Sequence, residues 1–225
     1  MSTIQQNLNN IKSQLPANVT LVAVSKTKPV ADLMEAYDAG QRIFGENKIQ
    51  EMTDKWEVMP KDIEWHMIGH VQTNKVKYMA PYVSLIHGVD SLKLLQEINK
   101  QAAKNNRVID CLLQVYIAEE ESKFGLDEQE LEEMLKQVQH DKDNFKNIKI
   151  VGLMGMATFT ENQNQIEKEF KHLKTIFDKY SKLNTENCQL NTLSMGMSGD
   201  YQLAISCGST MVRIGSSIFG SRNYQ

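Results

Sequence analysis

Lys26 is the first residue in the chain whose type and position could do covalent chemistry. It comes two residues after Thr20–Val24 (TLVAV), an apolar run with the composition of a β-strand. Where a strand ends near a partly buried site, loss of hydration and nearby cations favour a neutral amine, which is a nucleophile. A surface lysine paired with a carboxylate would fit the same position. Both interpretations stay open on position alone.

The last quarter of the chain is dense in glycines and hydroxyl side chains. They gather in residues 194–200 (SMGMSGD), 208–210 (GST) and 215–217 (GSS). Small residues at the end of a strand let backbone N–H groups approach an anion, and the start of a following helix adds partial positive charge. Ordinary turns use the same residue types. Their density nevertheless favours a phosphate site here.

Arg213 lies inside an otherwise apolar run, Met211–Ile214 (MVRI), between two of these hydroxyl-rich stretches. An arginine that is buried with such a strand needs a partner for its charge. That partner could be a structural carboxylate, the phosphate of a ligand or a ring nitrogen. Arg213 is therefore a candidate binding residue.

Histidines and cysteines do not point to a metal site. His66 and His70 are four residues apart, but they do not share an expected helix, and no third ligand has suitable spacing. His66 is therefore expected to be a core histidine or one that supports a site residue. The three cysteines lie far apart without a CxxC pair, so they imply neither a disulfide framework nor zinc.

The elements that position these residues follow a regular alternation. Eight short apolar or β-branched runs occur at residues 20–24, 42–45, 64–69, 82–88, 108–117, 148–154, 189–195 and 211–214. Helical periodicity appears between them, at residues 29–39, 91–105, 127–139 and 163–183, and an extra amino-terminal helix is expected within residues 1–14. Ser91 or Asp90 is expected to cap the second of these helices.

A strand followed by a helix, repeated, predicts parallel strands, because parallel pairing needs a crossover connection. Eight such units predict an α/β fold closed into a (β/α)8 TIM barrel. An open doubly wound sheet is the alternative that periodicity does not exclude. In a barrel, chemistry lies at the carboxyl ends of the strands, where Lys26, Asn47 and the residues around Ser198 and Gly215 are expected.

Composition limits the function classes. The chain has 225 residues, 41% of them hydrophobic and 24% charged, with a net charge of −3. We expect one domain over residues 1–225. The charge and the absence of a dense basic run argue against nucleic-acid binding. The amino terminus lacks an apolar signal core, and no run approaches the ~20 apolar residues that a membrane span needs. We therefore expect a cytoplasmic protein.

Several of these residues match motifs of a known family. The matching pieces are residues 21–26 (LVAVSK), 44–47 (FGEN) with Gln50 and Glu51, 65–69 (WHMIG) with Gln72 and 74–75 (NK), 193–198 (LSMGMS) with Asp200, 204–205 (AI), 208–210 (GST) and 212–215 (VRIG). In their order and spacing they resemble the pyridoxal phosphate homeostasis protein family, whose members look like the barrel half of bacterial alanine racemase.

The resemblance implies a cofactor and a set of residues that bind it. Pyridoxal 5′-phosphate would form a Schiff base with Lys26. The resemblance places Arg213 near the pyridine nitrogen, where a cation would weaken the ring as an electron sink. The remaining residues would surround the phosphate and the ring: Asn47, Met197, Ser198, Thr210, Gly215 and Ser216.

Two positions depart from the family pattern. Lys48 stands where relatives often have a tyrosine after the Glu-Asn pair, which puts a tyrosine contact to the cofactor in doubt. Lys123 matches a family lysine, but the proline often found downstream is absent. A second cofactor role for Lys123 is therefore the weaker expectation.

The family resemblance implies a reversible carrier or buffer for vitamin B6 inside the cell, with no established reaction. The chain ends at Gln225, just past the eighth run, without the second domain that closes a racemase site. An exposed cofactor without a second acid or base should racemise poorly. We also expect a monomer, with cofactor-dependent apoenzymes as possible recipients. An alanine-type racemase, a cofactor-free Schiff-base aldolase and a regulatory binding module remain as alternatives.

Overall fold

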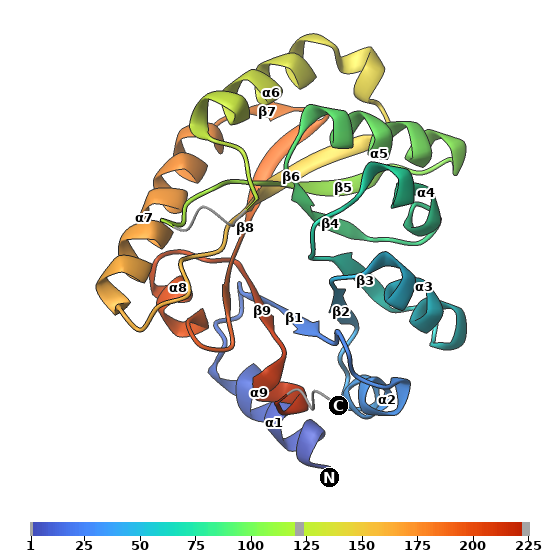
Figure 1. Ribbon diagram of the computed structural model, residues 1–225, viewed down its shortest axis with the longest axis vertical. Coiled ribbons are helices and arrows are strands. Elements are labelled where there is room, and N and C mark those ends of the chain that lie inside the picture. The colour runs from blue at the N-terminus through green and yellow to red at the C-terminus, as the bar shows by residue number, and fades with distance from the viewer. Residues whose placement is uncertain (1, 120–123, 222–225) are drawn as a thin grey trace.

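The structure is a computed structural model that describes residues 2–119 and 124–221. Within these residues, eight parallel strands form a closed barrel (Figure 1). They are β1 (Thr20–Val24), β2 (Ile43–Glu46), β3 (Glu64–Met67), β4 (Leu85–Val89), β5 (Ile109–Gln114), β6 (Ile148–Met154), β8 (Cys188–Met197) and β9 (Met211–Ile214). Strands β1 to β6 pair in chain order, β6 pairs with β8, β8 with β9, and β9 with β1. This closure confirms the (β/α)8 barrel and excludes the open sheet.

Helices surround the barrel and form the connections between its strands (Figure 1). They are α1 (Thr3–Gln14), α2 (Val30–Asp38), α3 (Ile49–Val58), α4 (Val76–Met79), α5 (Leu92–Lys104), α6 (Glu128–His140), α7 (Gln163–Tyr180), α8 (Tyr201–Ser206) and α9 (Ser216–Phe219), with short 3-10 turns at Thr73–Lys75 and Lys142–Phe145. In the part of the chain that is described, no helix is both long and apolar enough to span a membrane.

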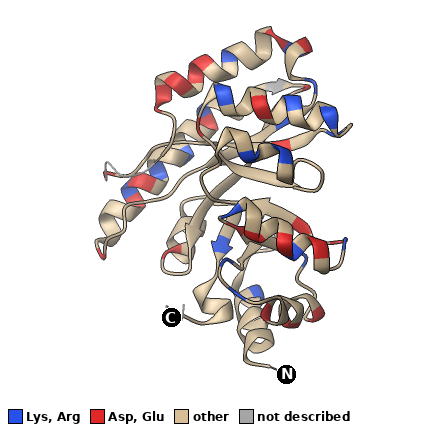
Figure 2. Cartoon of the chain, turned by 45° about the vertical axis from the view of Figure 1, so that its right-hand side comes forward, with Lys and Arg blue, Asp and Glu red and all other residues tan. Residues whose placement is uncertain are grey.

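The strands bury both of their faces, as expected for an all-parallel sheet covered by helices. One apolar cluster lies inside the barrel and contains Val22, Leu85, Leu112, Met154 and Met211. A much larger cluster lies between the outer face of the strands and the helices. Charged residues gather on the helices and are sparse on the strands (Figure 2), so a charged side chain inside the barrel calls for a specific explanation.

Local sequence sets where several helices begin. Ser91 caps α5 by accepting a hydrogen bond from the Leu94 backbone N–H, which decides between the two expected caps. Ser2 and Asp127 each form a reciprocal capping box with the residue three positions later. Each such cap stabilises its helix by ~1 kcal/mol.

One strand was not expected from periodicity. The two-residue strand β7 (Asn184–Thr185) pairs antiparallel with the start of β8. It is an addition at the amino end of the barrel, since its partner residues are the first of β8. The fourth strand also begins later than expected, at Leu85, because the Tyr82 and Val83 backbone N–H groups still bond to Met79 at the end of α4.

Candidate functional site

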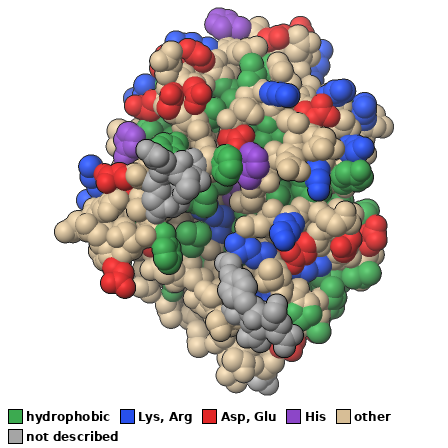
Figure 3. Space-filling model, viewed as in Figure 1, with side chains coloured by type: hydrophobic (Ala, Val, Ile, Leu, Met, Phe, Trp, Pro, Cys, Tyr) green, Lys and Arg blue, Asp and Glu red, His purple; other side chains and the backbone are tan. Residues whose placement is uncertain are grey.

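A cavity of about 490 Å³ opens at the carboxyl ends of the strands. In Figure 3 this face is hollowed near its centre, where basic side chains lie deep and hydrophobic side chains border the opening. The structure brings seven of the eight sequence-predicted site residues to this cavity: Lys26, Asn47, Met197, Ser198, Arg213, Gly215 and Ser216. These residues lie at the carboxyl ends of four strands, β1, β2, β8 and β9, or in the loops that follow them.

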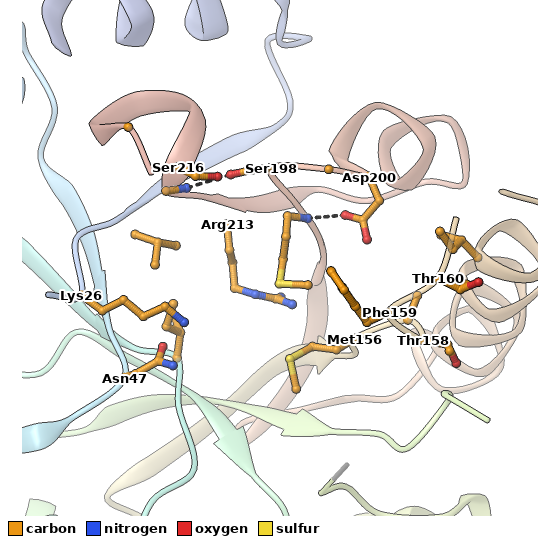
Figure 4. A pocket seen from close by; sticks show the side chains of 18 of the residues that line it. Lys26, Asn47, Met156, Thr158, Phe159, Thr160, Ser198, Asp200, Arg213 and Ser216 are labelled. Atoms are coloured by element: carbon orange, nitrogen blue, oxygen red, sulfur yellow. Dashed lines mark hydrogen bonds between the residues drawn. The ribbon is translucent and has the colours of Figure 1, made fainter. Parts of the chain in front are cut away.

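Lys26 enters the cavity from the connection that follows β1. Its side chain extends into the open space, with the Asn47 amide beside its end and the Arg213 guanidinium pointing into the same space (Figure 4). Asn47 follows β2, which pairs with β1 in parallel register, so the ends of the two strands bring these residues together. A primary amine beside an open cavity can attack a carbonyl group of a bound molecule.

Arg213 is 4% exposed and lies in β9. Its Nη1 donates to the Ser194 carbonyl oxygen at 2.9 Å and to the Ser194 hydroxyl at 2.6 Å, and its Nη2 donates to the Gly155 carbonyl oxygen at 3.0 Å. Burial lowers the pKa of Arg213 to about 10, so the group remains charged at neutral pH. Among residues 2–119 and 124–221, no carboxylate forms an ion pair with it. The protein thus orients a buried cation toward the cavity and leaves its charge without an ion-pair partner from the described residues.

A polar chain continues from Arg213 into the barrel. The Ser194 hydroxyl lies 3.2 Å from Nδ1 of His87, and Nε2 of His87 lies 3.1 Å from Nδ1 of His66. Burial lowers the pKa of His66 to about 3, and burial, His66 and Arg213 hold the pKa of His87 well below its usual range. Both imidazoles are therefore neutral at pH 7. His66 has the core position expected from sequence, whereas His70 is partly exposed beside Asp90.

Two connections meet to form a small cradle of backbone and hydroxyl groups. The Gly215 N–H donates to the Ser198 hydroxyl at 3.2 Å, which joins the loop after β9 to the loop after β8 (Figure 4). A side chain at position 215 would bring its Cβ within 2.9 Å of the Val24 carbonyl oxygen, so the close approach of β9 to β1 requires glycine there. Asp200 fixes the loop after β8 by accepting the Met197 N–H at 2.5 Å.

Thr210 is the predicted site residue that does not reach the cavity. It immediately precedes β9, so it lies at the amino end of the barrel, opposite the cavity. Its hydroxyl accepts the Leu193 N–H at 2.8 Å, and its own N–H donates to the Leu193 carbonyl. The structure gives Thr210 a role in joining β9 to β8 and does not place it among the residues that line the cavity.

The loop after β6 lines the opposite side of the cavity and was not identified from sequence. Its residues Met156, Ala157, Thr158, Phe159 and Thr160 all border the cavity. The buried carboxylate of Glu169 on α7 holds this loop by accepting the Thr158 N–H at 2.6 Å and hydroxyl at 2.7 Å. The available signal was two threonines, Thr158 and Thr160, shortly after the predicted strand at residues 148–154. Lys123 lies outside the described residues, and Lys48 precedes α3 without lining the cavity.

Comparisons with known proteins agree with this architecture. The family model described as the alanine racemase N-terminal domain matches residues 1–223. The chain is 37% identical to the pyridoxal phosphate homeostasis protein of Haemophilus influenzae, over 98% of this chain and 97% of that protein. It is 35% identical to the Escherichia coli protein of the same name, over 100% of this chain and 99% of that protein.

Solved structures give the same result. PipY of Synechococcus elongatus, solved with pyridoxal phosphate bound, superposes with a TM-score of 0.86 at 34% identity, covering 96% of this chain and all of that one. Alanine racemase of E. faecalis has the same fold at 16% identity and a TM-score of 0.74, and this chain covers 58% of it. The chain thus belongs to the pyridoxal phosphate homeostasis protein family, within the group defined by the alanine racemase N-terminal domain.

Proposed function

We propose that this protein binds pyridoxal 5′-phosphate as a Schiff base on Lys26 and serves vitamin B6 homeostasis in the cell as a carrier or buffer. The observation that carries the proposal is the convergence of an amine, a buried cation and a hydroxyl–amide cradle on one cavity. Relatives at 35–37% identity bear the homeostasis name, and PipY binds the cofactor. The residues present fit the group that those relatives imply.

Lys26 would hold the cofactor covalently. Its amine would form a C=N bond with the aldehyde carbon, and the aldehyde oxygen would leave as water. The reaction reverses on hydrolysis, which suits a protein that must release what it binds. The Asn47 amide, which lies near the end of Lys26, would hydrogen-bond the ring substituents beside that carbon.

The cofactor phosphate would bind at the cradle made by Ser198, Gly215 and Ser216, with Met197 against the ring. A phosphate carries charge and several acceptor oxygens, so hydroxyl and backbone N–H donors suit it. Gly215 lets the backbone approach closely, because a larger residue would clash with β1. Thr210 has no part in this proposal, since it lies at the other end of β9.

Arg213 would lie near the pyridine nitrogen. Because its pKa stays near 10 despite burial, it would face the ring as a cation. A cation there disfavours protonation of the ring nitrogen, and an unprotonated ring is a weaker electron sink. This placement favours holding the cofactor over using it for carbanion chemistry.

The residues that line the cavity also favour a carrier over an alanine-type racemase. A racemase needs a second acid or base on the face of the substrate opposite the lysine. The described lining residues include no tyrosine, histidine or cysteine. Lys28 donates to the Phe219 and Ser221 carbonyls, and an Asp200 oxygen accepts the Met197 N–H. Lys28 and Asp200 are thus both already hydrogen-bonded to backbone groups of the protein.

Two measurements separate these functions. A carrier saturated with pyridoxal phosphate should load an apoenzyme faster than its Schiff base hydrolyses and releases the cofactor into bulk solvent. It should also leave the α-hydrogen of L-alanine unexchanged in heavy water. Steady α-hydrogen exchange that disappears in Lys26→Ala would establish the racemase instead. A protein that fails to bind pyridoxal phosphate would favour the aldolase, in which Lys26 attacks a sugar carbonyl.

We also propose that the protein acts as a monomer in the cytoplasm and that its recipients are cofactor-dependent apoenzymes. Sedimentation of the loaded protein gives the oligomeric state, and cofactor transfer measured at increasing apoenzyme concentration shows whether delivery requires contact. A transfer rate that rises with apoenzyme concentration supports direct handover.

A further inference from the structure

The backbone on the carboxyl side of Lys26 has an unfavourable conformation. Thr27 has a φ of 64°, in the left-handed region, and it is β-branched. That conformation costs a non-glycine residue about 1–3 kcal/mol and persists only where the surroundings enforce it. The question is what enforces it next to the residue that we propose as the covalent anchor.

Two side chains of α3 hold the backbone on either side of Lys26. Glu51 Oε1 accepts the Thr27 N–H at 2.6 Å, and Lys55 Nζ donates to the Ser25 carbonyl oxygen at 2.8 Å. Glu51 and Lys55 are one helical turn apart and form an ion pair at 2.7 Å. Residues 25 and 27 are thus tied to one rigid element, while the Lys26 side chain between them extends into the cavity.

A third contact fixes this pair to the barrel. Lys55 Nζ also lies 2.7 Å from Glu46 Oε1, and the same oxygen accepts the Ser25 hydroxyl at 2.6 Å. Glu46 is the last residue of β2 and is completely buried, and its Oε2 has no hydrogen-bond partner among the described residues. Burial raises the pKa of Glu46, and the Lys55 charge opposes that shift.

A buried cluster of charged side chains is not expected to add much to the free energy of unfolding. The desolvation of a buried ion pair can exceed the attraction between its charges, and well-packed apolar residues often stabilise a fold as much or more. The Glu46 oxygen without a partner adds to that cost. What the cluster does provide is direction, because the backbone hydrogen bonds of Glu51 and Lys55 end on Thr27 and Ser25, on either side of Lys26.

We propose that Glu51 and Lys55 are positioning residues, which hold Ser25 and Thr27 so that the Lys26 amine points into the cavity. The inference rests on the proposed function of Lys26 as the covalent anchor. Neither residue lines the cavity, so neither contacts the cofactor. Their removal should slow formation of the covalent bond and leave the non-covalent contacts of the phosphate and ring unchanged.

Glu51→Ala is the primary variant, because Glu51 is 23% exposed at its side chain and its loss leaves Lys55 paired with Glu46. Glu51→Gln keeps an acceptor for the Thr27 N–H and serves as the conservative variant. Glu167→Ala is the matched control, since Glu167 forms the same i,i+4 ion pair with Lys171 on the exposed side of α7. Thermal unfolding checks that each variant folds.

Two readouts separate positioning from a general loss of binding. The first is the rate at which borohydride-trapped pyridoxyl label accumulates on Lys26 after pyridoxal phosphate is mixed with the protein. The second is the affinity for pyridoxine 5′-phosphate, which has the ring and phosphate but no aldehyde. Glu51→Ala should slow labelling on the order of tenfold or more, as small misplacements of reacting groups do. It should not change the second readout.

Thr27→Gly provides an independent check through the backbone itself. Glycine adopts a positive φ without the steric cost, so the turn should then need less enforcement. In that background, Glu51→Ala should slow labelling by a clearly smaller factor than in the natural sequence. Such a difference is the signature of coupled sites in a double-mutant cycle.

The outcomes are distinct. If the natural protein never labels, the proposed function fails. If it labels and Glu51→Ala labels at the same rate, the positioning role is overturned. The role is also overturned if the affinity for pyridoxine 5′-phosphate falls as far as the labelling rate, or if the Thr27→Gly background leaves the effect unchanged.

Discussion

Arg42, at the amino end of the barrel strands, and Arg213, at the carboxyl end, lie in opposite electrostatic surroundings. Arg42 is partly exposed, forms an ion pair with Asp62 at 2.9 Å and stacks on the Tyr37 ring at 3.8 Å. Arg213 is buried among carbonyl and hydroxyl oxygens. The protein pairs the first cation directly with a carboxylate, whereas it orients the second with neutral hydrogen-bond acceptors, and the Asp200 charge acts on it only through space. A charge that is held in place without a direct ion pair is suited to a ligand.

The largest expected effect is a pH dependence of the free energy of unfolding, which comes from the two histidines near Arg213. His66 and His87 lie buried in the chain that starts at Arg213, and their neutral forms are favoured. Because their pKa values are lower in the folded state than in the unfolded state, the unfolded protein binds more protons below about pH 6.5. For His66, whose folded-state pKa is about 3, the free energy of unfolding should therefore fall by about 1.4 kcal/mol per pH unit between roughly pH 6 and pH 4. His87 should add to the fall in the same direction.

Denaturant titrations of the apoprotein across that range measure this slope. A His66→Gln variant should show a shallower slope than the natural protein, because it lacks one of the two buried imidazoles. Equal slopes in the two proteins would contradict a buried, neutral His66 beneath Arg213.

Exchanging each arginine for glutamine tests the comparison between the two ends directly. Arg213→Gln removes the oriented charge and should weaken pyridoxal phosphate retention on the order of tenfold to a hundredfold, corresponding to the ~1.5–3 kcal/mol of a charged hydrogen bond. Arg42→Gln should leave retention unchanged and lower stability by less than about 1 kcal/mol, as expected for an exposed pair. Equilibrium dialysis gives both affinities, and unchanged retention in Arg213→Gln would refute its placement.

The hydroxyl groups of Ser198 and Thr210 allow the same comparison between the two ends of the barrel, with smaller expected effects. Ser198→Ala should weaken cofactor phosphate binding a few-fold, because one neutral hydrogen bond is worth about 1 kcal/mol. Thr210→Ala should leave affinity unchanged and lower the free energy of unfolding by about 1 kcal/mol, since the Leu193 N–H loses its acceptor. Titrations of the two variants with pyridoxine 5′-phosphate distinguish them. Equal losses of affinity would place Thr210 at the site after all.

These contrasts also show what sequence reasoning can reach. Periodicity located β1, β6 and β9 at their observed bounds, because β-branched apolar runs end abruptly at polar or glycine residues. Lys26 and Arg213 stood out because each is charged at or within such a run. The two-residue strand β7 carries too little sequence to produce a pattern.

Thr210 illustrates a limit of reading motifs along the chain. It belongs to a glycine- and hydroxyl-rich stretch like those at residues 194–200 and 215–217. In a parallel barrel, however, a residue before a strand and a residue after it lie at opposite ends. The residue types of Thr210 and Ser198 look alike in sequence, and only strand direction separates them.

The Glu46–Lys55 contact illustrates a second limit. The residues of the cluster come from the turn after β1, from β2 and from α3, and the charges of Glu51 and Lys55 resemble an ordinary solvated helix face. Their burial depends on how α3 packs beside the turn after β1. Sequence spacing can suggest the i,i+4 pair but not its contact with the backbone around Lys26.

The most direct test of the account is the site of covalent attachment. Purified protein is mixed with pyridoxal phosphate, reduced with borohydride, digested and mapped by mass spectrometry, alongside Lys26→Ala. The account predicts a near-visible absorption band before reduction and a reduced pyridoxyl group on Lys26, with both absent from the variant. A label on another lysine that persists in Lys26→Ala, or no band and no label at all, would contradict it.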